Sequence, residues 1–251
     1  MKRGQVAIWV IVAAGIIIAF LLLFLVKRSV VIDTIEETNP QFFVQKCIKD
    51  STLEALNLML PQGGFVAPLN YKLYNNTKVT YLCENVGYYY PCINQHPMLL
   101  NEMKKEIKDY TQLKIEDCYS IMKGEFEKRQ YSVQLDSDPV SLDVEFKPGS
   151  IDFDISKKVT LSKGEEVINF DKFNVAVPSH AYELGSIAVE ITNQESKYCN
   201  FDYLGYMIIY SDFNIRKETR SDGTKIYIII DKRSHEEMQF AIRGCVTPQG
   251  I

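Results

Sequence analysis

The hydrophobic pattern of the chain opens with one long uncharged segment, Gln5–Val26. At about 1.5 Å of rise per residue, a helix of this length spans roughly 33 Å, which is enough to cross a hydrocarbon core of about 30 Å. A cleaved secretory signal would have a shorter apolar core and a small-residue cleavage site. This run instead ends at Lys27-Arg28. We therefore predict a retained transmembrane helix over residues 5–28, preceded by a basic cytoplasmic leader at 1–4 and followed by a linker at 29–39.

Helical spacing of apolar residues dominates the next part of the chain, residues 40–130. Asn39 and Pro40 are typical of a helix start, and the Pro-Gln-Gly-Gly sequence from Pro61 is typical of a helix end. The predicted elements here are a helix from Pro40 to about Leu60, short strands at Phe65–Val66 and Val79–Leu82, and a helix from Pro97 to about Lys128.

After Arg129 the pattern changes to alternating apolar and polar residues, which predicts strands. Pro178 and Ser179 open one further helix, and the Asp222-Gly223 step suits a type I′ hairpin turn. Residues 131–251 therefore form a mainly β part with one helix, which can join residues 40–130 in a single ectodomain. The predicted strands are Tyr131–Leu135, Val140–Phe146, Ile151–Ile155, two between Lys158 and Val177, Asn214–Arg220, Thr224–Asp231 and Met238–Val246. The fold class predicted is α+β, with helices packed on a mostly antiparallel sheet.

The charged residues are distributed unevenly. All 32 acidic residues and 24 of the 28 basic ones follow position 28, so this part of the chain carries a formal net charge of −8. Nucleic-acid binding needs a basic footprint, which excludes nucleic acid as an expected partner. The same acidity argues against docking of the domain on an anionic leaflet.

The six cysteines indicate the compartment. An even number of cysteines downstream of a membrane anchor suits an oxidising exterior. A zinc site is not predicted, because the sequence has no Cys-x-x-Cys and no histidine at ligand spacing from a cysteine. Inert buried thiols are the third explanation. We expect disulfides, and therefore a cytoplasmic N-terminus and an extracellular domain. Sequence alone does not fix the pairing, but the short loop and the predicted elements suggest Cys83–Cys92, Cys47–Cys118 and Cys199–Cys245.

Signatures of catalysis are absent from the sequence. There is no Gly-x-Ser-x-Gly motif and no phosphate-binding loop. The acidic pair Asp136 and Asp138 could open a calcium loop, but the required Gly and Glu are replaced by Ser141 and Lys147. Acidic residues that alternate along strands are expected to form the solvated face. We predict no catalytic residues, no metal site and no cofactor.

Two features could mark a surface of interest. Tyr88, Tyr89 and Tyr90 lie inside the short Cys83–Cys92 loop, where constrained tyrosines would make a recognition surface. The alternative, which we favour from the sequence, is that these rings fold back onto the domain's own core. Asn75 begins the sequon Asn75-Asn76-Thr77 and is a candidate glycosylation site.

The N-terminus resembles the class III signal of archaeal type IV pilin-like proteins, through Lys2-Arg3-Gly4-Gln5 followed by the apolar helix. In that family a prepilin peptidase cuts after the glycine, which implies processing between Gly4 and Gln5. The resemblance covers residues 1–26 and departs from the fuller pattern at Trp9, where many members have Glu. The ectodomain is similar to uncharacterised single-pass archaeal proteins in Val44–Lys49, Leu60–Phe65 and Phe240–Arg243, which implies the topology but no activity.

Three classes of function remain. We expect a membrane-anchored extracytoplasmic protein of the cell envelope with a structural or interaction role. Its expected partners are the lipid bilayer, further copies of itself or other envelope proteins. The alternatives are a pilin-like filament subunit cleaved after Gly4 and a cell-surface enzyme whose site the sequence does not reveal.

Overall fold

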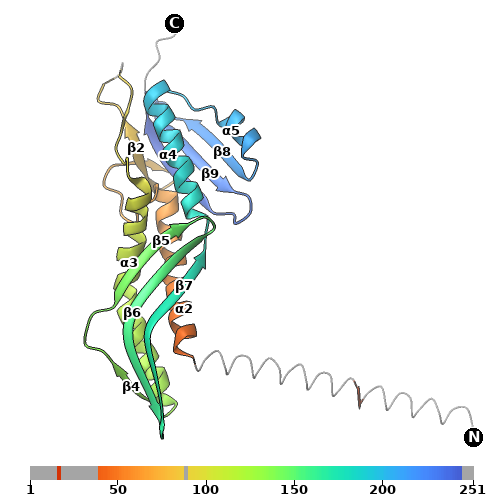
Figure 1. Cartoon of the computed structure of the whole chain (residues 1–251). Helices are drawn as coiled ribbons and strands as arrows, with labels where there is room; N and C mark the ends of the chain where they lie inside the picture. The colour runs from red at the N-terminus through yellow and green to blue at the C-terminus, as the bar shows by residue number, and fades with distance from the viewer. Residues whose placement is uncertain (1–15, 18–38, 88–89, 245–251) are drawn as a thin grey trace, which may run out of the picture. The chain divides into compact units, whose positions relative to one another are not determined.

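The computed structural model describes residues 16–17, 39–87 and 90–244 (Figure 1). Most of the predicted leader, transmembrane helix and linker therefore lies outside the described residues. In the part of the chain that is described, no helix is both long enough and apolar enough to cross a membrane. The chain divides into two compact units, Met1–Val44 and Gln45–Ile251. The second unit contains both the helical and the β-rich parts, and its fold is α+β.

The larger of its two sheets has six strands, in the order β1-β2-β10-β9-β8 with β3 paired to β2. The last strand, β10, lies between β2 and β9, parallel to β2 and antiparallel to β9. Both faces of these three central strands are largely buried, as their apolar runs require. The strand bounds are β1 Tyr71–Tyr74, β2 Thr77–Glu84, β3 Ile93–Asn94, β8 Phe213–Thr219, β9 Lys225–Asp231 and β10 Glu237–Arg243.

The two faces of this sheet are covered in different ways. Helix α4, Ala181–Tyr198, packs on one face against β2, β9 and β10 (Figure 1). On the other face, side chains from the sheet's own edges close over an apolar cluster. Lys72 of β1 pairs with Asp222 of the β8–β9 turn at 2.5 Å, and Arg220 lies 5.7 Å from the ring centre of Tyr74. Side chains of β1 therefore reach the β8–β9 turn at the other edge of the sheet. The cluster beneath these contacts is Tyr74, Val79, Tyr81, Ile226, Ile228 and Ala241.

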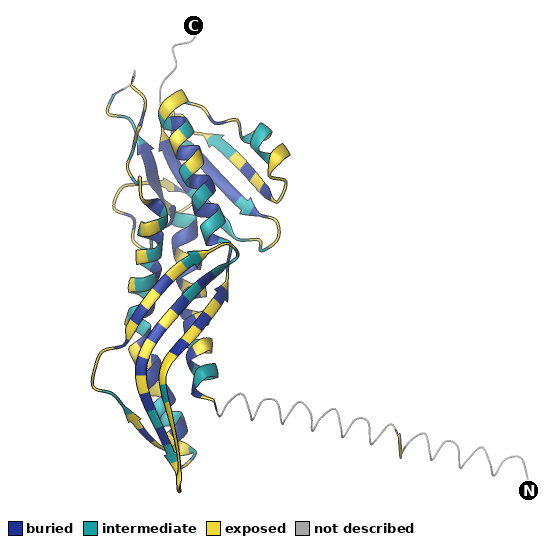
Figure 2. Cartoon of the chain, in the orientation of Figure 1, coloured by how far each residue is buried: buried dark blue, intermediate teal, exposed yellow. Residues whose placement is uncertain are grey.

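The second sheet is antiparallel and is built around one long strand, β6. One edge of β6 pairs first with β5 and then with β4, while β7 pairs along the other edge. Its exposed face carries the alternating acidic residues, as predicted, and Figure 2 shows the resulting stripes of buried and exposed positions. The bounds are β4 Ser132–Leu135, β5 Ser141–Lys147, β6 Ser150–Lys163 and β7 Glu166–Pro178.

Two long helices precede the second sheet. α2 spans Pro40–Met59 and leads into a 3₁₀ turn, η1, at Leu60–Gln62; α3 spans Leu99–Lys128 and packs on β4 and β5. The buried residues of α3 recur every three or four positions from Leu99 to Phe126, which is the helical period the sequence predicted. A disulfide between Cys47 and Cys118 joins α2 to α3, with 6.3 Å between the Cα atoms. Both helices agree with prediction to within two residues.

A buried ion pair fixes the end of α4 to the sheet. Glu195 is 0% exposed, and one of its carboxylate oxygens lies 2.6 Å from Nζ of Lys225 on β9. The hydroxyl of Tyr227 donates to the other oxygen, and Lys225 also donates to the carbonyl of Cys199 at 2.7 Å. Burial and the neighbouring Glu195 carboxylate raise the pKa of Tyr227, so the phenol stays a donor. This arrangement satisfies a buried charge that would otherwise destabilise the fold.

Several sequence-based predictions for strands and turns are wrong. Phe65–Val66 is not a strand, and the unpredicted β1 pairs with β2 through the two-residue turn Asn75-Asn76. Both asparagines have positive φ, 47° and 65°, as a type I′ turn requires. In the β8–β9 turn only Gly223 has positive φ, so Ser221–Gly223 form a three-residue loop rather than a type I′ turn. Ile151–Ile155 is one part of β6, which continues through an irregularity to Lys163.

Candidate recognition surface at the disulfide loop

The Cys83–Cys92 loop closes at the end of the central sheet. Cys83 ends the buried run of β2, and β3 returns beside it, so Cys83 lies opposite Asn94. The Cys83–Cys92 disulfide, predicted from the short loop, brings the two Cα atoms to 5.4 Å. The backbone N–H of Asn85 donates to the carbonyl of Arg243 at 3.0 Å and ties the loop to β10. The Asn85 end of the loop is thus tied to the central strands β2 and β10, and the Cys92 end leads into β3.

Inside this frame the loop presents side chains to solvent. Tyr90 is 70% exposed, and Val86 and Ile93 are also exposed. The N–H of Tyr90 donates a hydrogen bond to the carbonyl of Gly87 at 3.3 Å. The inward folding that we favoured from the sequence is therefore wrong for Tyr90, whose ring does not cover the core. Tyr88 and Tyr89 lie outside the described residues.

A hollow of about 590 Å³ separates this loop from the β8–β9 turn. Its volume falls within the range of small-molecule and peptide-side-chain sites. The loop and the turn form its two walls, and the end of β10 lies between them. The residues that line it are Asn85, Val86, Gly87, Ser221, Asp222, Gly223, Arg243 and Gly244.

The charged groups in the hollow are already paired. The Lys72 ammonium holds the pKa of Asp222 down at about 2, aided by hydrogen bonds from Thr224, although partial burial opposes the shift. Arg243 lies 3.4 Å from one carboxylate oxygen of Glu84, and the other oxygen accepts a hydrogen bond from Asn70 at 2.8 Å. Among these lining residues no nucleophile lies beside a free base.

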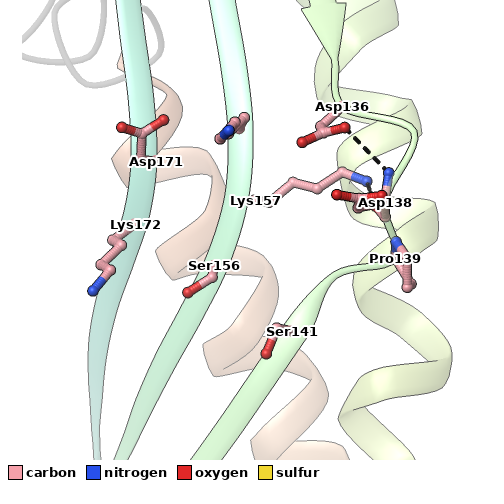
Figure 3. A pocket seen from close by; sticks show the side chains of 9 residues that line it. Asp136, Asp138, Pro139, Ser141, Ser156, Lys157, Asp171 and Lys172 are labelled. Carbon is pink, nitrogen blue, oxygen red and sulfur yellow. Dashed lines mark hydrogen bonds between the residues drawn. The ribbon is translucent and has the colours of Figure 1, made fainter.

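A second hollow, of about 390 Å³, lies where β6 is irregular (Figure 3). The register of β6 shifts between Ser156 and Val159, so Lys157 takes a buried position and donates to the carbonyl of Asp138. Asp136 accepts from the N–H of Asp138 at 3.3 Å (Figure 3). Asp136 and Asp138 thus form a turn that bridges β4 and β5. Across the described ranges, no group of three or more His, Cys, Asp or Glu side chains is placed to hold a metal ion.

The three histidines have local partners or turn positions. His96 lies 2.5 Å from the carboxylate of Glu102 in the first turn of α3. The Nδ1 atom of His180 lies 3.7 Å from Glu236, and that same carboxylate accepts hydrogen bonds from the hydroxyl of Ser179 and the N–H of His180. His235 adopts a positive φ of 63° in the turn before β10. Ser179 and His180 therefore fix the start of α4 to Glu236 through hydrogen bonds.

Other predicted positions fall in different places. Asn75 is exposed in the β1–β2 turn, and the structure does not bring it to the hollow. Cys199 is disulfide-bonded and ends α4 in a left-handed conformation, while its predicted partner Cys245 lies outside the described residues. Gly4 and Gln5 also lie outside them.

Sequence reasoning missed the residues that hold the surface in place. Glu195, Lys225, Lys72 and Asp222 look like ordinary solvated charges in the sequence, and only the tertiary pairing brings them together. The one available signal was Lys225, which opens the apolar strand Lys225–Asp231 at a position that becomes half-buried.

Comparison with known proteins yields no relative: the chain matches no family model, no curated sequence and no solved structure. The function is therefore argued from the geometry of this chain alone.

The Lys72–Asp222 pair predicts a measurable pH dependence. Because the pKa of Asp222 is lower in the folded chain than its ordinary 3.8, ionised Asp222 stabilises the fold above about pH 4, and this contribution is lost as the pH falls towards 2. Replacing Lys72→Met should move the carboxyl titration of Asp222, followed by NMR, up towards its ordinary midpoint. Lys78→Met, on the same hairpin, is the control and should leave it unchanged. An unshifted Asp222 titration in Lys72→Met would contradict the pairing.

Proposed function

We propose that the chain is a membrane-anchored extracytoplasmic protein of the cell envelope that acts by binding, with the face of the Cys83–Cys92 loop as its recognition surface. The observation that carries this proposal is the exposed Tyr90, which lies two residues before Cys92 of the Cys83–Cys92 disulfide. A disulfide-closed loop has less conformational entropy to lose on binding, and tyrosine offers a large contact area with a polar tip.

The disulfides support the extracytoplasmic part of the proposal. Cys47, Cys83, Cys92, Cys118 and Cys199 are all disulfide-bonded, and such bonds persist mainly in oxidising compartments. The uncharged Gln5–Val26 segment supplies the anchor in this proposal. The acidic domain and the paired charges of the hollow point to a protein or small polar partner rather than nucleic acid.

The main rival is a pilin-like subunit cleaved after Gly4. It rests on the Lys2-Arg3-Gly4-Gln5 sequence. Both proposals have the same topology, but in the pilin-like subunit the N-terminal helix leaves the bilayer after cleavage and packs into a filament. N-terminal sequencing of protein from native membranes separates the two, because a mature chain beginning at Gln5 favours the pilin subunit and an intact Met1 excludes it.

Membrane topology is the first test of the proposal. In intact cells, we expect an added protease to digest the domain without lysis, and the chain to stay with the membrane after alkaline extraction. Unreduced, denatured protein should not react with a maleimide of high mass, whereas reduction should expose all six cysteines. A domain protected from protease until lysis, or thiols that react before reduction, would place it in the cytoplasm and refute the proposal.

The recognition surface is tested by site-specific photo-crosslinking in cells. A photoreactive p-benzoylphenylalanine in place of Tyr90 should form adducts with another macromolecule, because a bound partner would cover this ring. The same substitution at Leu113, an exposed residue of α3, is the matched control and should form none. Tyr90→Ala should leave the free energy of unfolding within about 0.5 kcal/mol of the wild type, since the ring packs on little. Absence of adducts at position 90 would contradict a role in recognition.

A further inference from the structure

An exposed apolar surface that the proposed function does not use lies on α5, the short helix Tyr203–Ile209. Leu204, Ile208 and Ile209 are 59%, 82% and 75% exposed, and Tyr210 beside them is also exposed. We call these four residues the α5 patch. No charged residue occurs between Asp202 and Asp212. Aliphatic side chains this exposed and this close together usually mark a binding surface.

The patch is held outward by contacts on the opposite side of α5. The ring of Tyr206 packs 5.4 Å from that of buried Phe201, and the sulfur of Met207 accepts a hydrogen bond from the N–H of Ile215 on β8. Asp202 caps the helix by accepting from the N–H of Gly205 at 3.0 Å. α5 is therefore fixed against β8 by one side (Figure 1), and Leu204, Ile208 and Ile209 cannot turn inward without breaking these contacts.

Lysine side chains lie at both ends of α5, Lys217 beside Tyr203 and Lys232 beside Ser211, and Lys197 lies at the end of α4. The ammonium of Lys217 lies 5.1 Å from the ring centre of Tyr203, and that of Lys197 lies 5.0 Å from Tyr198. Lys232 donates to the carbonyl of Ser211 at 2.6 Å. Across the described ranges, none of these three lysines has a carboxylate within ion-pair distance. Three acids also lie near α5: Asp202 caps the helix, Asp212 lies 3.4 Å from Arg233, and Glu190 accepts a hydrogen bond from Gln194. Burial raises the pKa of Tyr206, and the charges of Tyr210 and Glu190 add to this shift. The local charge thus differs from the acidic average of the domain.

We propose that the α5 patch docks on the surface of a phospholipid bilayer, with Leu204, Ile208 and Ile209 in the acyl boundary and the three lysines at the phosphates. From their exposed fractions the four residues present roughly 500 Å², whereas a stable protein–protein interface buries about 800 Å² on each partner. A lipid surface needs no such area or shape match, and aliphatic residues flanked by tyrosine and lysine suit its interface. The proposal rests on the proposed function, because the anchor keeps the domain beside a bilayer.

A fluorescent reporter in the full-length chain tests this docking. The native tryptophan is removed by Trp9→Phe and a reporter is introduced by Ile208→Trp, at a site exposed enough to tolerate it. In vesicles of equal parts phosphatidylcholine and phosphatidylglycerol, the reporter's emission should shift to the blue, and brominated acyl chains should quench about half of it. The matched control, Trp9→Phe with Leu113→Trp, should stay red-shifted and unquenched. Replacing Lys197, Lys217 and Lys232 with Gln should reduce the quenching in these vesicles more than in pure phosphatidylcholine.

Each remaining outcome has a distinct meaning. A chain that resists alkaline extraction but carries an unquenched reporter at position 208 overturns docking and leaves the anchor intact. A chain released by alkaline extraction overturns the anchor, and docking with it. A blue shift that disappears when the chain is diluted into excess lipid means that a second copy covers the patch, and this also overturns the proposal.

Discussion

The last strand, β10, is the element on which the rest of the domain depends, because it fills the centre of the larger sheet. It pairs in parallel with β2, where Ala241 lies opposite Tyr81, and antiparallel with β9. Without it, no strand pairing would join β2 and its disulfide loop to β9 and β8. The backbone of the loop also depends on it directly, since the N–H of Asn85 donates to Arg243. Because β2 and β10 lie far apart in the chain, this pairing closes a long loop and can form only after most of the chain is available.

Helix α4 packs on one face of this sheet, and its C-terminal end leads the chain towards α5. The Glu195–Lys225 pair holds the end of α4 on β9, and Cys199 then turns the chain through a left-handed residue towards α5. Replacing Glu195 alone would leave the half-buried Lys225 ammonium without its counter-ion, and breaking a buried ion pair in this way typically destabilises a protein by about 3–5 kcal/mol. The α5 patch is exposed because the opposite side of α5 packs on Phe201 and β8, whereas the disulfide loop is tied to the sheet through Asn85 and the Cys83–Cys92 bond.

Features set by neighbouring residues in the sequence could be predicted, whereas features set by contacts between distant segments could not. The period of α3 and the short spacing of Cys83 and Cys92 predicted that helix and that disulfide correctly. The β1–β2 hairpin has a local signal that coincides with the sequon: asparagine tolerates the positive φ of a type I′ turn, and Asn75 and Asn76 both adopt it. The parallel β10–β2 pairing has no local signature. Tyr90 was expected inside because exposed aromatics are rare, a tendency that a disulfide-held loop overrides.

The central claim is that β10 joins β2 and β9 into one cooperatively folded unit that carries both surfaces. Native-state hydrogen exchange of the disulfide-bonded protein tests it most directly, since it measures an opening free energy for each amide. The claim predicts that the hydrogen-bonded amides of Ala241, Tyr81 and Ile228 exchange only through global unfolding, with opening free energies equal to within about 1 kcal/mol. Exchange of the β10 amides at a distinctly lower free energy than those of β9 would show that the strand detaches on its own, and would contradict the claim.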